Sequence, residues 1–219
     1  MKKSQVVTRF TMLAVVSACL AAAAGAVVGA AIAGWAGWLL FGIAVAAIFT
    51  LAWGAFTPNA PLFGRVVDGH GTPDRVMALT FDDGPSAETT PQVLEALRER
   101  EVRATFFVLG RHADEHPALV AEIAADGHQV ASHGYDHALL TFARSEQVTE
   151  QLTRTEGSIS QASGSDPTRY FRAPHGFRNP LVHKVAELRG YRIVGWTKGV
   201  WDTAKPGVEA IVRRSVGGF

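Results

Sequence analysis

An uncharged, strongly apolar tract near the N-terminus limits what this chain can fold into. No Asp, Glu, Lys or Arg lies between Arg9 and Arg65 in a sequence of 219 residues. A helix needs about 20 residues to cross a hydrocarbon core about 30 Å thick, so residues 10–56 are too long for one span and suit two. We therefore expect a basic tail over residues 1–9 and two transmembrane helices over residues 10–56, near 11–33 and 38–56.

The tract predicts an integral membrane protein of the bacterial inner membrane type, with membrane lipid as a partner, but two topologies stay open. Lys2, Lys3 and Arg9 favour a cytoplasmic N-terminus, and two spans would return the following domain to the cytoplasmic side. A cleaved signal peptide followed by a single span is the alternative, because small residues follow the basic start. The sequence leaves open the side on which the domain lies.

The rest of the chain has the composition of an ordinary soluble domain. From Arg65 onward it carries 18 Lys+Arg and 20 Asp+Glu. The single cysteine, Cys19, lies in the apolar tract, which excludes a disulfide-stabilised scaffold. A slightly acidic domain lacks the basic surface that recognises nucleic-acid phosphates, so no nucleic-acid partner is expected. Nothing in the sequence predicts an oligomeric state.

Segments typical of strands and of helices alternate after a Pro- and Gly-containing stretch, residues 57–73, which we interpret as a linker. The expected strands are 76–81, 104–109, 128–132, 169–172 and 191–196. The expected helices are 91–102, 117–125, 145–162, 179–188 and 206–216. This alternation predicts a parallel α/β architecture, and we assign residues 74–219 to one such domain.

Two polar clusters follow expected strands, where α/β barrels build their active sites. Asp82 and Asp83 end the first strand, and two adjacent carboxylates suit one metal ligand and one general base; an acidic turn is the alternative. His133 and His137 stand four residues apart, which in a helical turn would bring two imidazoles to one side for zinc; two surface histidines are the alternative. The pair His112 and His116 has the same spacing among charged neighbours, and we expect it to be solvated.

Two further clusters are weaker. Arg172, in Arg-Ala-Pro-His-Gly, follows another expected strand, and an arginine there can hold a buried carboxylate in its ionised form. A surface ion pair is the alternative for this arginine. Asp202 follows Trp201, and an aspartate beside aromatic residues could orient a proton donor.

Taken in order, Thr-Phe-Asp-Asp-Gly-Pro, His-x-x-x-His and Arg-x-Pro-x-Gly resemble the motifs of the NodB-homology polysaccharide deacetylases, carbohydrate esterase family 4. The resemblance covers residues 65–219. It implies a distorted (β/α) barrel and a metal-dependent hydrolase that removes N-acetyl groups from chitin- or peptidoglycan-like amino-sugar polysaccharides or oligosaccharides. It also implies that Asp83, His133 and His137 bind a divalent metal, which we expect to be Zn²⁺.

The same resemblance implies roles for four other residues. Asp82 matches the catalytic base, and Arg172 matches the residue that tunes it. The backbone N–H of His175 matches the donor to the oxyanion. Asp202 matches the aspartate that orients a late catalytic histidine.

The motif that carries this late histidine in the family, Leu-x-His, is not found, and no histidine follows His183. We therefore expect a barrel that is incomplete at its C-terminus, from a fragment or a truncated gene. Two alternative functions stay open. One is a deformylase or deacetylase of a lipid-linked amino sugar, which suits a cytoplasmic domain; the other is a non-catalytic fragment.

Overall fold

The computed structural model describes residues 21–22, 24–29, 34–69, 76–200 and 202–216, except for the side chain of Thr203. The chain forms two compact units, Met1–Trp53 and Gly54–Phe219. Each unit is described by itself below.

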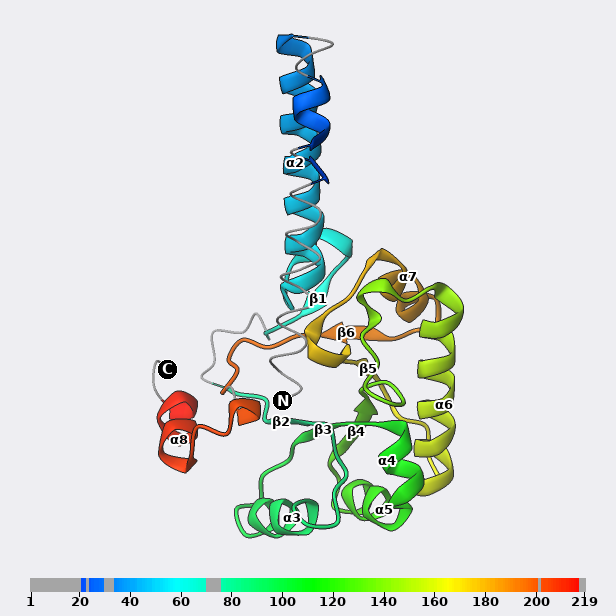
Figure 1. Ribbon diagram of the computed structural model, residues 1–219. Helices are drawn as coiled ribbons and strands as arrows, with labels where there is room; N and C mark the ends of the chain where they lie inside the picture. The colour runs from blue at the N-terminus through cyan, green and yellow to red at the C-terminus, as the bar shows by residue number, and fades with distance from the viewer. Residues whose placement is uncertain (1–20, 23, 30–33, 70–75, 201, 217–219) are drawn as a thin grey trace. The chain divides into compact units, whose positions relative to one another are not determined.

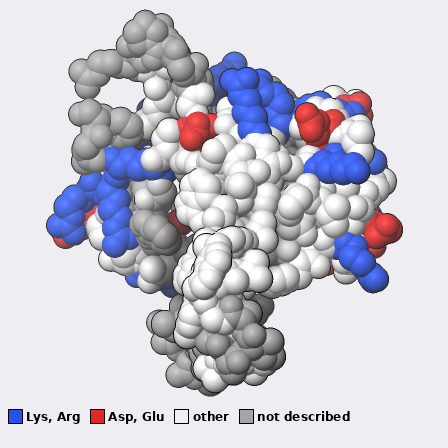
Figure 2. Space-filling model, turned by 90° about the horizontal axis from the view of Figure 1, so that it is seen from above, with Lys and Arg blue, Asp and Glu red and all other residues white. Residues whose placement is uncertain are grey.

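The main described element of the first unit is α2 (Trp35–Phe56), whose last three residues belong to the second unit. Its 22 residues correspond to about 33 Å of helix, enough to cross a bilayer core, and an 18-residue window within it has a mean hydropathy of 2.2. No charged residue interrupts it, and the described part of the apolar tract is white in Figure 2. Within the described residues α2 is the one helix with the length and composition of a span. The predicted second span therefore has a structural counterpart.

The predicted first span, 11–33, lies largely outside the described residues. Residues 21–22 and 24–29 within it are helical. Two transmembrane helices therefore remain a prediction.

Six parallel strands form a curled half-barrel in the second unit, with the order β1-β6-β5-β4-β3-β2 (Figure 1). The strands are β1 (Val66–Val67), β2 (Thr80–Asp82), β3 (Thr105–Val108), β4 (Gln129–Ser132), β5 (Thr168–Phe171) and β6 (Arg192–Val194). This architecture confirms the predicted parallel α/β fold with an incomplete barrel. Five of the six strands overlap expected strands: β3, β4 and β6 lie within them, β5 is shifted by one residue, and β2 shares only Thr80 and Phe81 with the expected strand 76–81.

The sixth strand, β1, lies inside the stretch interpreted as a linker. Val66 and Val67 pair in parallel register with Ile193 and Val194 of β6, so this stretch adds an edge strand to the sheet. A short 3-10 helix, Pro61–Phe63, precedes it. The described part of residues 57–73 therefore belongs to the folded unit and is not a free linker. Its side chains show no strand periodicity, and its pairing with β6 comes from backbone hydrogen bonds.

Helices α3 to α7 lie along one side of the sheet (Figure 1). The helices of the second unit are α3 (Thr90–Arg98), α4 (Gly110–Glu115), α5 (Pro117–Ala125), α6 (Ser145–Ser163), α7 (Pro180–Leu188) and α8 (Val208–Val216). The long helix α6 buries the predicted stripe, with Val148 and Leu152 in one apolar cluster and Ile159 in the other. Helix α6 therefore contributes buried residues to both apolar clusters of the core.

Candidate active site

The carboxyl ends of the strands bring the predicted polar residues together. Asp82 is the last residue of β2, while His133 directly follows β4 and Arg172 directly follows β5. In a parallel sheet these ends share one edge. The backbone of Asp83 turns there with a φ of 69°, which allows the two adjacent carboxylates to serve the same site with different partners.

Asp83 lies between the two histidines of the His-x-x-x-His motif. Its Oδ1 is 3.3 Å from Nε2 of His133 and 3.2 Å from Nε2 of His137. The three ligand atoms all lie within 4.8 Å of one another, so the group has the composition and spacing of a metal site. His133 is buried, whereas half of the Asp83 side chain is exposed, so the group opens to solvent on one side.

The histidine pair is not in a helical turn, and that expectation was wrong. The segment is a loop in which Gly134 and His137 have positive φ angles of 82° and 63°. The buried Gln151 of α6 stabilises this loop, because its Oε1 accepts hydrogen bonds from the N–H groups of Tyr135 (2.7 Å) and Asp136 (3.3 Å). The imidazoles of His133 and His137 are thus brought together by a loop with two residues of positive φ, and not by the spacing of a helical turn.

The electrostatics of the cluster favour an ionised Asp83 and an unprotonated His137. The hydrogen bond from His133 is the main cause that lowers the pKa of Asp83, and the charges of the neighbouring histidines add to it. Burial lowers the pKa of His137 from its ordinary value of 6.5 to about 4. Near neutral pH His137 is therefore an unprotonated imidazole, the form that binds metals.

Arg172 forms the second half of the site. It is 2% exposed, and its Nη1 donates to Oδ1 of Asp82 (2.7 Å) and to Oγ1 of Thr80 (2.9 Å). Its Nη2 donates to the backbone oxygen of Gly195, which follows β6 (2.9 Å). Burial is the main cause that lowers the pKa of this guanidinium, and Asp82 opposes the shift. Arg172 therefore forms a buried ion pair with Asp82, and the alternative of a surface ion pair was wrong.

Aromatic rings and a backbone bond fix Arg172 further. The rings of Phe107 and Trp196 lie 4.1 and 4.7 Å from its guanidinium carbon, so they enclose the charge. Its backbone oxygen is 2.7 Å from Nδ1 of His133, which leaves Nε2 of that imidazole to face Asp83. Arg172 thereby connects the Asp82 pair to the metal-type cluster.

His175 joins the cluster, whereas Asp202 is not brought to it among the described contacts. His175 lies in the 3-10 turn Pro174–Gly176 with a φ of 60°, and its ring centroid is 4.4 Å from that of His137. Burial against these groups lowers its pKa, although much of the residue surface is exposed. Asp202 begins the short helix Asp202–Ala204, and it is exposed. The role expected for Asp202 stays a prediction.

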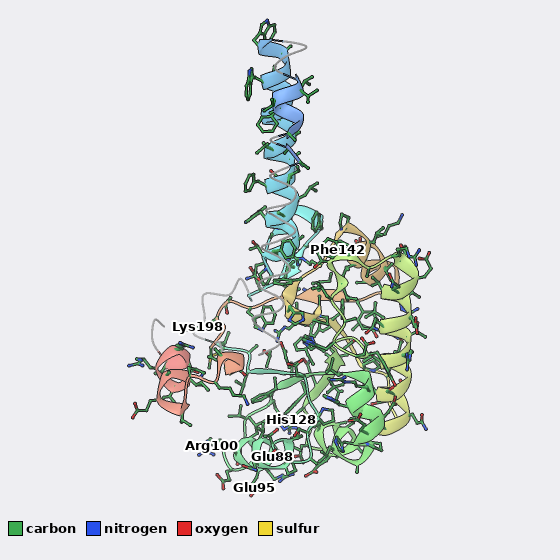
Figure 3. All side chains as sticks on the ribbon, viewed as in Figure 1. Glu88, Glu95, Arg100, His128, Phe142 and Lys198 are labelled. Atoms are coloured by element: carbon green, nitrogen blue, oxygen red, sulfur yellow. The ribbon has the colours of Figure 1, made fainter. Side chains whose placement is uncertain are left out.

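Two other histidines show what spacing alone could not decide. His112, which was expected to be solvated, has its Nδ1 2.7 Å from the backbone oxygen of Asp83. His128, labelled in Figure 3, directly precedes β4, whereas His133 directly follows it; the ring of His128 packs on Phe106 with centroids 5.4 Å apart. The contact of His112 with Asp83 joins residues that are distant in the sequence. No local sequence pattern would therefore have identified His112 as part of the site.

Comparisons with known proteins show which family and fold this chain resembles. The family model of polysaccharide deacetylases matches residues 69–194. The chitooligosaccharide deacetylase of Rhizobium leguminosarum bv. trifolii is 40% identical over 145 residues, which cover 66% of this chain and 67% of that protein. The structure of the peptidoglycan deacetylase PdaC from Bacillus subtilis is similar with a TM-score of 0.61 at 31% identity, over 67% of this chain and 71% of that one.

A third similar structure is a CE4 family pseudoenzyme from Bacillus anthracis. Its TM-score is 0.64 at 27% identity, over 68% of this chain and 52% of that one. The chain thus spans about two thirds of the length of the Rhizobium protein and about half of the pseudoenzyme.

Proposed function

The chain belongs to the polysaccharide deacetylase family, and from this premise we propose that it is a metal-dependent N-deacetylase of amino-sugar oligomers or polymers. One observation supports the proposal above all others. A metal-type cluster of one carboxylate and two imidazoles stands beside a second carboxylate, Asp82, that is paired with the buried Arg172. Metal-assisted hydrolysis of an amide uses a Lewis acid and a general base, and these two halves supply a place for each.

The residues present fit a divalent metal ion, for which we propose Zn²⁺. Two imidazoles and one carboxylate are a common ligand set of catalytic zinc, with a fourth position left for water or substrate. A tetrahedral ion with ligand distances of about 2.0–2.1 Å places neighbouring ligand atoms about 3.3 Å apart. The Asp83–His133 and Asp83–His137 separations of 3.3 and 3.2 Å match that value. The bond from Nδ1 of His133 to a backbone oxygen orients this ligand, as outer contacts do in metal sites.

A metal held there would polarise the acetamide carbonyl and activate water. Asp82 would take the proton of the attacking water, and Arg172, bound to Oδ1, fixes the direction in which the other carboxylate oxygen points. The backbone N–H of His175 would donate to the oxyanion, as the family motif implies, and the ring of this residue lies beside that of His137. These roles rest on the proximity of the groups and on the family motifs.

The substrate we propose is an amino-sugar oligomer or polymer such as a chitooligosaccharide or peptidoglycan, because the relatives named above are a chitooligosaccharide deacetylase and a peptidoglycan deacetylase. We also propose that α2 anchors the protein in a membrane, since its length and apolar composition suit a span. Membrane lipid would then be a partner of the first unit.

Acetate release tests the proposal. The full chain, purified in detergent and supplied with Zn²⁺, is incubated with N-acetylchitopentaose and separately with N-acetylated peptidoglycan, and free acetate is measured. The proposal predicts acetate from at least one substrate and its loss on chelation.

The similarity to a pseudoenzyme favours one competing function, a non-catalytic carbohydrate-binding protein. Binding of chitopentaose without acetate release would support that function and contradict ours. Formate or acetate release from a lipid-linked amino sugar alone would support the deformylase alternative.

A further inference from the structure

The segment that leaves α2, residues 55–60, lies against both loops that shape the proposed active site. We propose that residues 55–60 are a positioning element of this site, which fixes the loop of His175 and the backbone that binds Arg172. The inference rests on the proposed function, and it assigns a role to a stretch that the sequence presented as a linker. Figure 1 shows β1, which follows this segment in the sequence, beside β6 in the second unit.

The first group of contacts holds the loop that follows His175. The N–H of Arg178 donates to the backbone oxygen of Ala55 (3.1 Å). The ring of Phe177 packs edge-on against Phe56, with centroids 5.2 Å apart and an interplanar angle of 85°. Phe177 in turn lies 5.8 Å from the ring of His175. Residues 55–60 thus contact the His175 turn through the ring of Phe177, which packs on both Phe56 and His175.

The guanidinium of Arg178 strengthens this attachment. The residue is 1% exposed, and its Nη2 donates to the backbone oxygens of Ala60 and, at 3.4 Å, of Thr57. Burial lowers the pKa of Arg178 to about 10, so the side chain stays charged near neutral pH. A buried charge needs such acceptors, and here residues 55–60 supply the oxygens that the described structure shows for it. Displacement of the segment would therefore expose the guanidinium of Arg178 to solvent or leave it buried without these acceptors.

The second group of contacts reaches Arg172. The side chain of Asn59 accepts from the N–H of Trp196 (3.1 Å) and donates to its backbone oxygen, so the amide pairs with the backbone just beyond the end of β6. Trp196 stacks on the guanidinium of Arg172, and the preceding residue, Gly195, supplies the oxygen to which Arg172 donates. Asn59 therefore binds the residue next to Gly195, whose backbone oxygen accepts from Arg172. Arg172 in turn binds Asp82.

Two glycines show how closely the segment packs. A Cβ on Gly195 would clash with Oδ1 of Asn59, and a Cβ on Gly176 would lie 2.7 Å from Cγ of Pro58. Gly176 also has a φ of 71°, which favours glycine. Both positions need a residue without a side chain because residues 55–60 occupy the space beside them.

The contacts predict a defect in turnover rather than in binding of metal or substrate. None of the described contacts of residues 55–60 involves Asp83, His133 or His137. We expect Asn59→Ala in the full chain to lower kcat at least about 10-fold, because small misplacements of catalytic groups have effects of this size. KM and the Zn²⁺ affinity should change less than about 2-fold. Asn59→Asp keeps the acceptor for the Trp196 N–H and should recover part of the loss.

A second readout does not depend on activity. Hydrogen exchange of the backbone amides in residues 174–178 should become faster in Asn59→Ala and in Phe56→Ala, while residues 129–133 of β4 keep their protection. Leu62→Ala is the matched control, because Leu62 is a partly exposed residue of the same region whose side chain faces Gly54. If Asn59→Ala destabilises the chain too far, the milder Phe56→Leu replaces it.

The outcomes separate this inference from the proposed function. A chain that released no acetate would contradict the proposed function, and the exchange comparison alone would then decide the inference. Asn59→Ala and Phe56→Ala that matched Leu62→Ala in both kcat and exchange would overturn it. A lower kcat without faster exchange in residues 174–178 would overturn it as well, since the segment would then act by another route.

Discussion

His112 on α4 places Nδ1 2.7 Å from the backbone oxygen of Asp83, so a histidine outside the metal-type cluster holds the backbone of one of its members. Asp83 has a left-handed φ of 69°, a conformation that costs a residue with a side chain roughly 1–2 kcal/mol. A hydrogen bond to its carbonyl offsets part of this cost. The relationship makes His112 a support for the proposed metal ligand Asp83.

Replacement of His112 should therefore weaken metal binding. A hydrogen bond contributes about 0.5–1.5 kcal/mol, so His112→Ala should lower the Zn²⁺ affinity about 2- to 10-fold. The affinity is measured by competition with a chromophoric chelator. His116→Ala is the matched control, because none of the described hydrogen bonds joins His116 to Asp83. Equal affinities of the two variants would show that the contact does not support the ligand.

Loss of Arg172 should destabilise the second unit. Its guanidinium is buried and joins β2, β5 and the end of β6, so Arg172→Ala leaves Asp82 and the Gly195 oxygen without their partner. Removal of one member of a buried ion pair costs about 3–5 kcal/mol. Pulse proteolysis in urea should show a loss of this size in the free energy of unfolding. A loss below about 1 kcal/mol would mean that the pair is solvated.

Acid should weaken the fold through His183. Burial, helped by the charge of Arg178, lowers the pKa of this histidine from 6.5 to about 4. Between these values the unfolded chain binds a proton that the folded chain does not, so stability falls by about 1.4 kcal/mol for each pH unit below 6.5. His183→Asn should remove this contribution, so that the variant loses about 2 kcal/mol less than the wild type between pH 7 and pH 5.

The same urea experiment at the two pH values checks this expectation. From pH 7.5 to pH 8.5 both proteins should show the same change in stability, since His183 is neutral in both states there. Equal losses between pH 7 and pH 5 would contradict the assignment.

Topology decides which form of the substrate the domain can meet. Two spans predict that a reporter fused after Pro61 is active in the cytoplasm, where an oligosaccharide or a lipid-linked sugar is the accessible substrate. Paired cytoplasmic and periplasmic reporters at this site measure it. A reporter active only in the periplasm would contradict the helical hairpin, and it would favour an extracytoplasmic polymer.

The sequence was informative where periodicity or a motif reports on local structure. The stripe Val148, Leu152 and Ile159 predicted α6 because these residues meet the core at helical spacing. The two-residue strand β1 was missed, since two valines among prolines and glycines carry no alternation, and only pairing with β6 defines it. The six-residue helix α4 was missed because most of its residues are polar or charged.

The candidate site shows the same limit. The residue types of Asp83, His133 and His137 predicted a metal site, and the structure brings them together. The helical turn expected for the histidine pair was wrong, because the same spacing is reached by a loop with two positive φ angles. The contacts of His112 and of Asn59 join segments that are distant in the sequence, so no local pattern could predict them.

The rate of acetate release by Asp82→Asn, at the same Zn²⁺ occupancy as the wild type, tests the central claim most directly. Asparagine keeps the shape of the side chain and an oxygen for Arg172, but it cannot accept the proton of water. Loss of a general base lowers the rate by about 10²–10⁴. The account predicts a fall of this size on N-acetylchitopentaose with the metal fully retained. Turnover equal to that of the wild type would contradict it.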